Sequence, residues 1–417
     1  MFKYPSVRTF TSQTQPQSKK ILEGYRIIDA SRILVGAFGS MMLADMGAEV
    51  IKIEQPGMGD ETRKWGPPFR GKDSTYFISI NRNKKSITLD LKSEEGLKIL
   101  NGLVSKADIF MTNFVPNQRS KLQIDYQDFQ TINPKLIYAS VQGFPQKSIW
   151  ENKAAFDLTI QAMSGQMHCT GDPDGSPFKV GYAVTDILTG MTLLQGILGA
   201  IIHRERTGEG QFINTSLLEA NLFSLSYVVS SWLNGQTEYN RMGNSHPNIA
   251  PYSVYRTKDQ DFIVIGVATD SQFEKLCSII KMEVRDEYKS NSLRCKHRTQ
   301  LNAEIDSILI RDWIKVDLIK AMTEKAIPFS EIKSVKQLLE EPEIASMGMT
   351  GRVNTDKYAT NERQYLEYPK NPLHFSRSEL SELKEPPLLG ENTDEILREL
   401  LGYNQEEIQN LRSKGVI

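Results

Sequence analysis

The stretch YRIIDASRILVGAFGSMMLADMGAEVIKIE, residues 25–54, contains a strand, a helix and a second strand in close succession. Residues 25–30 and 49–54 are short apolar runs of the kind that form buried strands. Between them, small and apolar residues recur at helical spacing over 35–46, and Gly47 ends that helix. A β-α-β unit with such short connections predicts a parallel sheet in an α/β layer fold.

The same alternation continues along most of the chain. The pattern predicts helices over 92–105, 186–204 and 216–232, strands over 109–112, 136–141, 211–215 and 261–267, and a loop rich in Gly and Pro over 56–71. The sequence pattern changes beyond about residue 241. We therefore expect a large α/β domain over 23–224 and a smaller domain over 225–330. The closing segment is a Pro-rich turn followed by two helices that Gly402 separates.

The composition of the 417 residues is that of a globular protein, with 39% hydrophobic and 24% charged residues. Lys and Arg total 50 against 51 Asp and Glu, so no global positive field exists to hold nucleic acid or an anionic membrane. The three cysteines are scattered and no CxxC or HExxH spacing occurs, so we expect no disulfides and no metal site. Polar residues and glycines interrupt the longest apolar stretch, 187–202, which predicts a buried helix rather than a membrane span.

The first residues have a distinct composition. Residues 1–22 are basic and rich in Ser and Thr, and the first carboxylate of the chain is Glu23. This is typical of a mitochondrial transit peptide, and a short disordered terminus is the alternative. We therefore expect 1–22 to be a targeting segment and the protein to be mitochondrial.

The turn after the first strand carries no nucleotide-binding fingerprint. Residues 31–39 contain neither G-x-G-x-x-G nor the Walker pattern, which argues against a nicotinamide-dependent dehydrogenase. Two acids lie where chemistry could occur: Asp186, where an apolar strand gives way to a helix, and Asp157, which follows Phe156. Spacing alone favours helix capping for Asp186 and a cap or surface role for Asp157. The alternative for Asp186 is a carboxylate nucleophile held at a helix start.

Seven short motifs, taken in order, resemble the class III CoA-transferase family, of the formyl-CoA transferase and carnitine CoA-transferase type. They are GAEVIKIE (47–54), NRNKKSI (81–87), NFVP (113–116), AFD (155–157), TDILTG (185–190), TGEGQ (207–211) and PLLGENT (387–393). Together they cover nearly the whole chain after residue 22.

A second group of motifs narrows the resemblance. It consists of DETR (60–63), WGPPF (65–69), STY (74–76) and RMG (241–243) with His246. These are similar to the family members of animal mitochondria that exchange CoA between succinyl-CoA and dicarboxylates such as glutarate or 3-hydroxy-3-methylglutarate. The resemblance thus agrees with the transit-peptide interpretation of the N-terminus.

The resemblance implies a Rossmann-like large domain built from N- and C-terminal parts, completed by 331–417, in an interlocked homodimer. It implies that Asp186 is the nucleophile and carries CoA as a thioester. Acyl-CoA and dicarboxylates would be the substrates, with no permanently bound cofactor and no metal. The CoA contacts that it implies are Leu34, Val35, Gln55, Leu89, Asp90, Lys92, Asn113, Phe114, Val115, Lys121 and Asp157.

A dicarboxylate substrate leaves its second carboxylate to be bound, and guanidinium geometry suits that role. We expect Arg82 to bind it, with Arg63 as the second choice and His246 also within reach. A structural or surface role is the alternative for each of the three residues.

The chain departs from the family pattern at three places. Gln55 stands where Arg is common, Asn117 stands where Gly is common, and residues 146–148 lack a Thr-Gly-Pro. These departures bear on the CoA contacts more than on the reaction. Acyl-CoA racemases of the superfamily need a His where Phe156 stands, which argues against racemase or isomerase chemistry. A non-catalytic acyl-CoA-binding protein is the other alternative.

Overall fold

The computed structural model describes residues 20–417, and its contacts divide the chain into two compact units. The first unit contains the residues up to 154 together with 186–217 and 350–417, and the second contains 155–185 and 218–349. The expected division places 155–185 and 218–224 in the large domain and 331–349 in the returning segment, so the two divisions differ at these three segments.

The predicted targeting segment lies outside the described residues except for its last three. Of these, Leu22 is buried and packs in the core of the first unit. The fold therefore includes residue 22.

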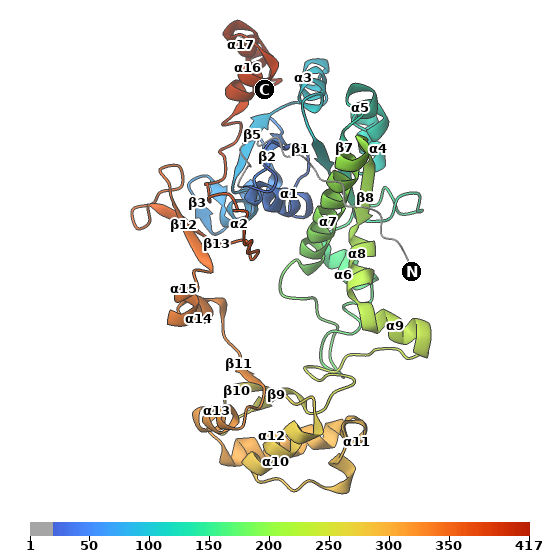
Figure 1. Ribbon diagram of the computed structural model, residues 1–417, viewed down its shortest axis with the longest axis vertical. Coiled ribbons are helices and arrows are strands. Elements are labelled where there is room, and N and C mark those ends of the chain that lie inside the picture. The colour runs from blue at the N-terminus through green and yellow to red at the C-terminus, as the bar shows by residue number, and fades with distance from the viewer. Residues whose placement is uncertain (1–19) are drawn as a thin grey trace, which may run out of the picture. The chain divides into compact units, whose positions relative to one another are not determined.

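A six-stranded parallel sheet forms the centre of the first unit, in the order β5-β2-β1-β6-β7-β8 (Figure 1). The strands are β1 (Arg26–Asp29), β2 (Glu49–Glu54), β5 (Lys84–Thr88), β6 (Ile109–Thr112), β7 (Ile137–Gln142) and β8 (Phe212–Ser216). The strands of this sheet that were predicted from the sequence are confirmed to within one residue at each end, and β5 is the strand of this sheet that was not predicted. The order reverses between β1 and β6, and open α/β sheets bind ligands at such a point, outside the carboxyl ends of their strands.

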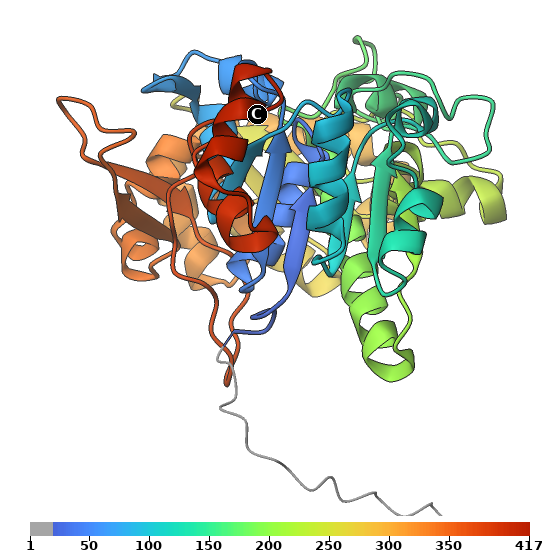
Figure 2. The same ribbon diagram turned by 90° about the horizontal axis from the view of Figure 1, so that it is seen from above.

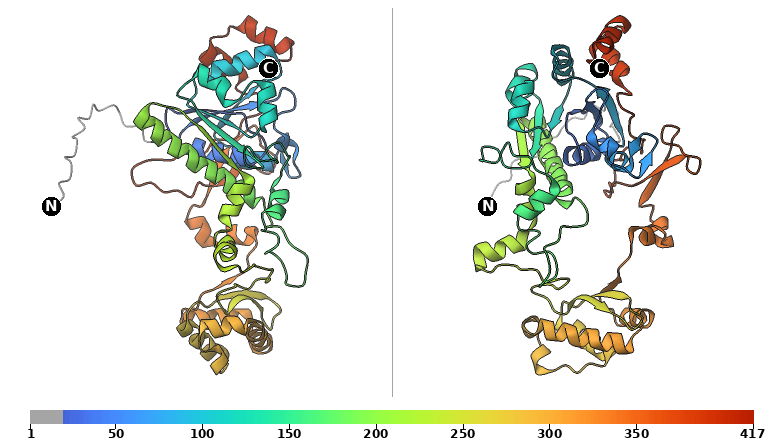
Figure 3. Two further views of the ribbon diagram at one scale, coloured as in Figure 1. Left: turned by 90° about the vertical axis from the view of Figure 1, so that its right-hand side faces the viewer. Right: turned by 180° about the vertical axis from the view of Figure 1, so that it is seen from behind.

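Helices cover both faces of this sheet, because alternate side chains of a strand point to opposite faces. Ile27 packs with α1 (Val35–Asp45) and α7 (Val184–Thr207), and α7 runs along that face of the sheet (Figure 3). On the other face, Ile28 shares a core with the helices α3 (Glu94–Val104), α5 (Tyr126–Ile132), α16 (Thr393–Leu401) and α17 (Gln405–Ser413). Figure 2 shows the last two of these helices, in red, on the same side of the sheet as α3. The C-terminal segment thus completes the first unit, as the resemblance implies.

The first unit has smaller elements as well. They are the 3₁₀ helix η1 (Glu61–Lys64), the strands β3 (Phe69–Arg70), β4 (Asp73–Ser74), β12 (Thr350–Asn354) and β13 (Tyr365–Pro369), and the helices α2 (Thr75–Ile80) and α4 (Pro116–Leu122). The predicted loop 56–71 therefore contains η1 and β3.

Within residues 20–417, α7 is the one helix whose length and hydropathy would suffice to cross a bilayer. The structure extends it to 24 residues, beyond the predicted 186–204. Leu193, Leu194 and Ile197 are buried against the sheet, whereas Ile202 is exposed. Along its apolar side, α7 has the contacts of a core helix.

The second unit contains a small α+β fold with its own core. An antiparallel sheet of β9 (Tyr252–Arg256), β10 (Phe262–Gly266) and β11 (Phe329–Glu331) packs with α10 (Asp270–Ile280), α11 (Asn291–Lys296), α12 (Arg298–Asp312) and α13 (Lys315–Glu324). The unit also contains α6 (Asp157–Met163), α9 (Ser226–Gly235), the 3₁₀ helix η2 (Asp286–Tyr288), α14 (Val335–Leu339), α15 (Pro342–Ser346) and all but the first residue of α8 (Leu217–Ser224). The single helix predicted over 216–232 is thus two, because the chain turns at Ser226, whose φ is 36°.

Candidate active site

A cavity of about 600 Å³ opens at the carboxyl ends of β1, β2, β5 and β6 in the first unit. It is lined by Ala30, Arg32, Ile53, Glu54, Gln55, Gly59, Asp60, Leu89, Asp90, Leu91, Lys92, Ser93, Glu94, Leu97, Phe114, Gln118, Lys121, Leu122 and Gln123. It brings together six of the residues predicted to contact CoA: Gln55, Leu89, Asp90, Lys92, Phe114 and Lys121. The position matches the ligand-binding edge that the strand order defines.

Three cations contribute to the lining of this cavity. Lys92 lies just before α3, and Lys121 lies in α4. Arg32 lies in the turn between β1 and α1. The Arg32 guanidinium lies 4.7 Å from the centre of the Phe114 ring and 3.1 Å from Glu61 Oε1. Its side chain is 40% exposed, so it is free to reorient toward an anion. The cavity lining thus combines apolar side chains with these three cations and four carboxylates. Two of the carboxylates, Glu54 and Asp60, are paired with Arg63 and Lys52, so the cations are available to the phosphates of a ligand.

The other predicted contacts shape the turn that borders the cavity. The Asn113 side chain accepts a hydrogen bond from the Arg32 amide at 3.0 Å and donates one to the Arg32 carbonyl at 2.7 Å. Ile33 has a φ of 66°, and its amide donates to the Asp60 carboxylate at 3.2 Å. A β-branched residue is strained in this conformation, so its surroundings must hold the turn in place. Leu34 and Val35 follow the turn and are buried, and Val115 precedes α4.

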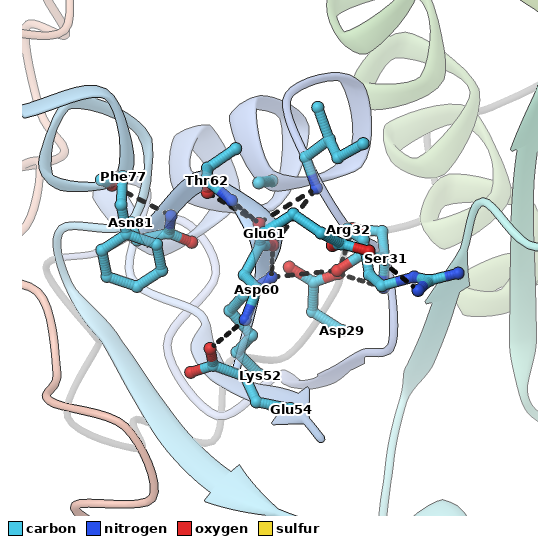
Figure 4. A network of polar contacts seen from close by, with 12 residues as sticks. Asp29, Ser31, Arg32, Lys52, Glu54, Asp60, Glu61, Thr62, Phe77 and Asn81 are labelled. Atoms are coloured by element: carbon cyan, nitrogen blue, oxygen red, sulfur yellow. Dashed lines mark hydrogen bonds and ion pairs between the residues drawn. The ribbon is translucent and has the colours of Figure 1, made fainter. Parts of the chain in front are cut away.

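A network of buried charges lies behind the turn (Figure 4). Lys52 Nζ lies 2.9 Å from Asp60 Oδ2 and donates to the Ser31 carbonyl at 2.9 Å. Burial acts to raise the pKa of Asp60, but the charge and hydrogen bond of Lys52 outweigh it and lower this pKa to about 2. Burial is also the largest influence on Lys84, whose pKa it lowers to about 8 although Asp29 lies 3.4 Å away. These charges join three strands to the turn that borders the cavity.

Both arginines predicted to bind the substrate carboxylate are buried and paired within the protein. Arg63 donates to Glu54 at 2.6 Å and to Asp73 at 2.8 Å, and its guanidinium stacks on a phenyl ring. Arg82 makes a bidentate pair with Asp45 at 3.1 and 2.7 Å, and is 4% exposed. These contacts correspond to the structural alternative, and they do not favour either arginine as a ligand of the substrate.

His246 belongs to the second unit and lies beside two tyrosine rings, those of Tyr227 and Tyr252. Its Nδ1 accepts a hydrogen bond from the Asn248 amide at 3.1 Å. Burial, and then the charge of Arg298, lower the pKa of His246, so its imidazole is neutral at pH 7. In that form it offers a substrate an N–H group rather than a positive charge.

Asp186 lies in the first turn of α7. One turn later, Gly190 lies against α1 so closely that a Cβ added to it would be 2.8 Å from the Val35 carbonyl oxygen. A Cβ on Gly39 would be 3.2 Å from the Gly190 carbonyl oxygen. This close contact between α7 and α1 fixes the position of Asp186 relative to α1, the helix that follows the strained turn at Ile33. A carboxylate in the first turn of a long helix is also stabilised in its charged form.

Asp157 is the first residue of α6 in the second unit. Its Oδ1 accepts a hydrogen bond from the amide of Thr185 at 2.8 Å, so it binds the residue directly before Asp186. The structure therefore gives Asp157 a defined contact with the start of α7, which spacing alone did not indicate.

The residues 20–417 contain no group of three or more His, Cys, Asp or Glu that could hold a metal ion.

Residues 22–393 match the model of CoA-transferase family III. The chain belongs to this family. The transferase is 38% identical to "Succinyl-CoA:glutarate CoA-transferase" of Mus musculus over 408 residues, which are 97% of this chain and 92% of the mouse protein. It is 36% identical to "Succinate--glutarate CoA-transferase" of Agrobacterium fabrum over 394 residues, 92% of this chain and 97% of that protein.

A solved structure supports the same assignment. The transferase superimposes on a CaiB/BaiF family protein from Brucella suis with a TM-score of 0.81 and 33% identity, covering 92% of this chain and 100% of that chain. The predicted family, the α/β fold and the transferase class are thereby confirmed.

Sequence reasoning missed several residues that line the cavity. Arg32 could have been found, because it lies in the turn after the first strand of a β-α-β unit, where such folds bind ligands. Gln118 and Gln123 carry no comparable signal, because they become neighbours of β2 and β5 only through the packing of α4.

Proposed function

We propose that the transferase moves CoA from succinyl-CoA to glutarate or a similar dicarboxylate, through a covalent intermediate on Asp186. The observation that carries the substrate assignment is the nearly full-length similarity to two proteins whose names specify CoA transfer between succinate and glutarate. The position of Asp186 in the first turn of α7 supports the covalent route.

The reaction begins with attack of the Asp186 carboxylate on the thioester carbonyl of succinyl-CoA. The C–S bond breaks, and CoA thiolate leaves a mixed anhydride between succinate and Asp186. The thiolate then attacks the aspartyl carbonyl, which releases succinate and forms an aspartyl thioester with CoA. Each attack forms one activated acyl bond as another breaks, so the acyl group stays activated and is not lost to water.

The second half of the reaction reverses these steps with the acceptor. A glutarate carboxylate attacks the aspartyl thioester and expels CoA thiolate, which leaves a glutaryl–aspartyl anhydride. The thiolate attacks the glutaryl carbonyl, giving glutaryl-CoA and the free Asp186 carboxylate. No proton or redox equivalent is consumed over the cycle.

The cavity at the carboxyl ends of β1 and β2 is the site that we assign to CoA. Arg32, Lys92 and Lys121 would meet its phosphates, and Leu89 and Phe114 its apolar parts. Gln55 would give a neutral hydrogen bond where a cation is common in the family. For the second carboxylate of the substrate, His246 remains the candidate among the three predicted residues that is not already ion-paired, as an N–H donor.

The homodimer and the mitochondrial location belong to the same proposal. The resemblance supports the interlocked dimer, and the basic, acid-free composition of residues 1–22 supports mitochondrial targeting. Fusion of 1–22 to a fluorescent protein tests the location, and sedimentation of the purified chain tests the dimer.

Trapping of the intermediate tests the mechanism. The wild-type protein, Asp186→Asn and Asp186→Ala are incubated with succinyl-CoA, with and without hydroxylamine, and their intact masses are measured. We expect a CoA adduct and a hydroxamate on the wild type and neither on the variants. The exposed Asp312→Asn serves as the control and should behave as the wild type. Equal trapping on Asp186→Ala would exclude Asp186 as the nucleophile.

The choice of acceptor needs a separate measurement. The rates of CoA transfer from succinyl-CoA to glutarate and to 3-hydroxy-3-methylglutarate are compared at equal concentrations. We expect both acids to accept CoA with glutarate preferred, and transfer to neither would overturn the substrate assignment while leaving the transferase class intact.

A further inference from the structure

We propose that Asp157 and Gln161 of α6 are positioning residues that fix the segment leading into Asp186. The proposal rests on the function proposed above, in which Asp186 is the reacting carboxylate. It gives Asp157 a role that differs from the CoA contact implied by the family resemblance.

Two hydrogen bonds link α6 to the two ends of the segment 180–185, and a third joins the two residues of α6 that accept them. The Asp157 Oδ1 accepts from the Thr185 amide at 2.8 Å, and the Gln161 Oε1 accepts from the Val180 amide at 2.9 Å. Between these two anchors, the Gln161 Nε2 donates to the Asp157 Oδ2 at 2.5 Å. Asp157 and Gln161 are one helical turn apart, so they lie on the same face of α6. Together they form a closed chain of contacts, with one anchor at each end of the segment.

The surroundings show why such anchors are needed. Gly181 and Tyr182 lie between the two anchors. No atom lies within 4 Å of the position that a Cβ on Gly181 would take, and Tyr182 is 62% exposed. Packing therefore does little to fix the middle of this segment. Gln161, in contrast, is fully buried, and both acceptor oxygens of Asp157 are occupied.

The amide of Thr185 belongs to the first turn of α7, where helix amides have no acceptor within the helix. The Asp157 carboxylate supplies that acceptor from a separate helix. Asp186 is attached through the next peptide bond, so its backbone direction depends on how firmly Thr185 is held. A reacting group must be placed closely, and a displacement of about 1 Å can cost about 100-fold in rate.

Each hydrogen bond between Asp157, Gln161 and the segment 180–185 has a fixed donor and acceptor, and substitutions that exchange these roles test the proposal. In Gln161→Glu, two carboxylate oxygens face each other where an amide and a carboxylate now meet, and the contact becomes repulsive. In Asp157→Asn, two amide NH₂ groups oppose each other, although the Thr185 anchor remains. In the double variant Asp157→Asn/Gln161→Glu, the amide at 157 donates to the carboxylate at 161, and both anchors keep an acceptor oxygen.

We expect Asp157→Ala and Gln161→Glu to lower kcat by about 10- to 100-fold while the KM for succinyl-CoA changes by no more than about threefold. Asp157→Asn should lie between them and the wild type, and the double variant should recover most of the lost kcat. The rate of hydroxamate formation on Asp186 should follow kcat. Thermal unfolding is measured alongside, and the exposed Asp312→Asn is the control for a lost carboxylate.

The outcomes separate this inference from the function on which it rests. Absence of a covalent adduct on the wild type would overturn the proposed mechanism itself. A normal adduct on the wild type with unchanged kcat in Asp157→Ala would overturn the positioning role alone. If the double variant stays as slow as Gln161→Glu, the negative charge of Asp157, and not its place in the chain of contacts, is what the reaction needs. That result too would contradict the proposal.

Discussion

The Lys52 ammonium and the Asp60 carboxylate lie 2.9 Å apart, and neither side chain is exposed to solvent. Asp60 also accepts hydrogen bonds from the amide and hydroxyl of Thr62, at 2.9 and 2.6 Å, and thereby starts η1. It further accepts from the amide of Ile33, in the strained turn beside the cavity. One carboxylate therefore holds four groups of three residues. Its removal would leave the buried Lys52 ammonium without its nearest opposite charge.

At the scale of the residue, we predict that Asp60→Asn lowers the free energy of unfolding by about 3–5 kcal/mol at pH 7, the usual effect of breaking a buried ion pair. The pKa of Asp60 is about 2 in the folded protein, below its ordinary value of 3.8. The ionised group therefore stabilises the fold fully above about pH 4, and this stabilisation is lost as the pH falls toward 2.

The difference between wild type and Asp60→Asn should accordingly shrink by about 2 kcal/mol between pH 5 and pH 2. Urea unfolding at several pH values, followed by circular dichroism, measures it. The exposed Asp312→Asn should change stability by no more than about 0.5 kcal/mol. A difference that stays constant down to pH 2 would show that Asp60 is not ionised against Lys52.

At the scale of the element, α1 and α7 approach each other through glycines. A methyl group on Gly190 would come within 2.8 Å of the Val35 carbonyl oxygen, which is backbone and cannot rotate away. One of the two helices would have to move, and the movement would occur one turn from Asp186. Gly199 lies in the same helix, and no atom lies within 4 Å of the position that its Cβ would take.

We predict that Gly190→Ala lowers the free energy of unfolding by about 1–3 kcal/mol, as overpacking does, and also lowers the rate of trapping on Asp186. Gly199→Ala should leave the rate unchanged and stabilise the protein by up to about 1 kcal/mol, because Ala is the better helix former. Thermal unfolding and hydroxylamine trapping on both variants measure this, and equal behaviour of the two would contradict the packing argument.

At the scale of the whole molecule, the first unit depends on residues far apart in the chain. The side chains of Lys85 and Glu395 pair at 2.7 Å, and the amide of Asp90 donates to the carbonyl of Val416 at 2.8 Å. The C-terminal helices α16 and α17 bury Ile396, Leu397, Ile408 and Leu411 in the core on one face of the sheet. The small core of the second unit is different, because all of its members lie between Ala250 and Phe329.

We therefore predict opposite results for two truncations. Removal of residues 386–417 should leave the first unit unable to fold, since it exposes one face of the sheet and removes partners of β5. The fragment 248–332 should fold alone and unfold cooperatively in urea, with Trp313 as a fluorescent probe. Circular dichroism and one-dimensional NMR of both proteins test this, and a disordered fragment would show that its core needs the rest of the chain.

Local patterns in the sequence were sufficient to predict most strands of the parallel sheet. The bounds of β2 and β6 follow from apolar runs between turn residues, and the order of short motifs was enough to identify the family. Strand β5 escaped prediction because it begins with Lys84 and Lys85, which look exposed in the sequence. Lys84 is in fact buried, and it is tolerated there only because Asp29, Asn81 and a backbone carbonyl surround it.

Tertiary structure alone decided which charged residues are available for chemistry. Arg63 and Arg82 suit a substrate carboxylate by type, but Glu54 and Asp45 already occupy them, and these partners are 9 and 37 residues away in the chain. The hydrogen bond between Asp157 and Thr185 joins residues 28 positions apart, so no local sequence pattern predicts it. Apolar periodicity is a property of neighbouring residues, so the sequence by itself determined the elements and the family. Ion pairs and hydrogen bonds join distant residues, so their partners are decided only when the chain has folded.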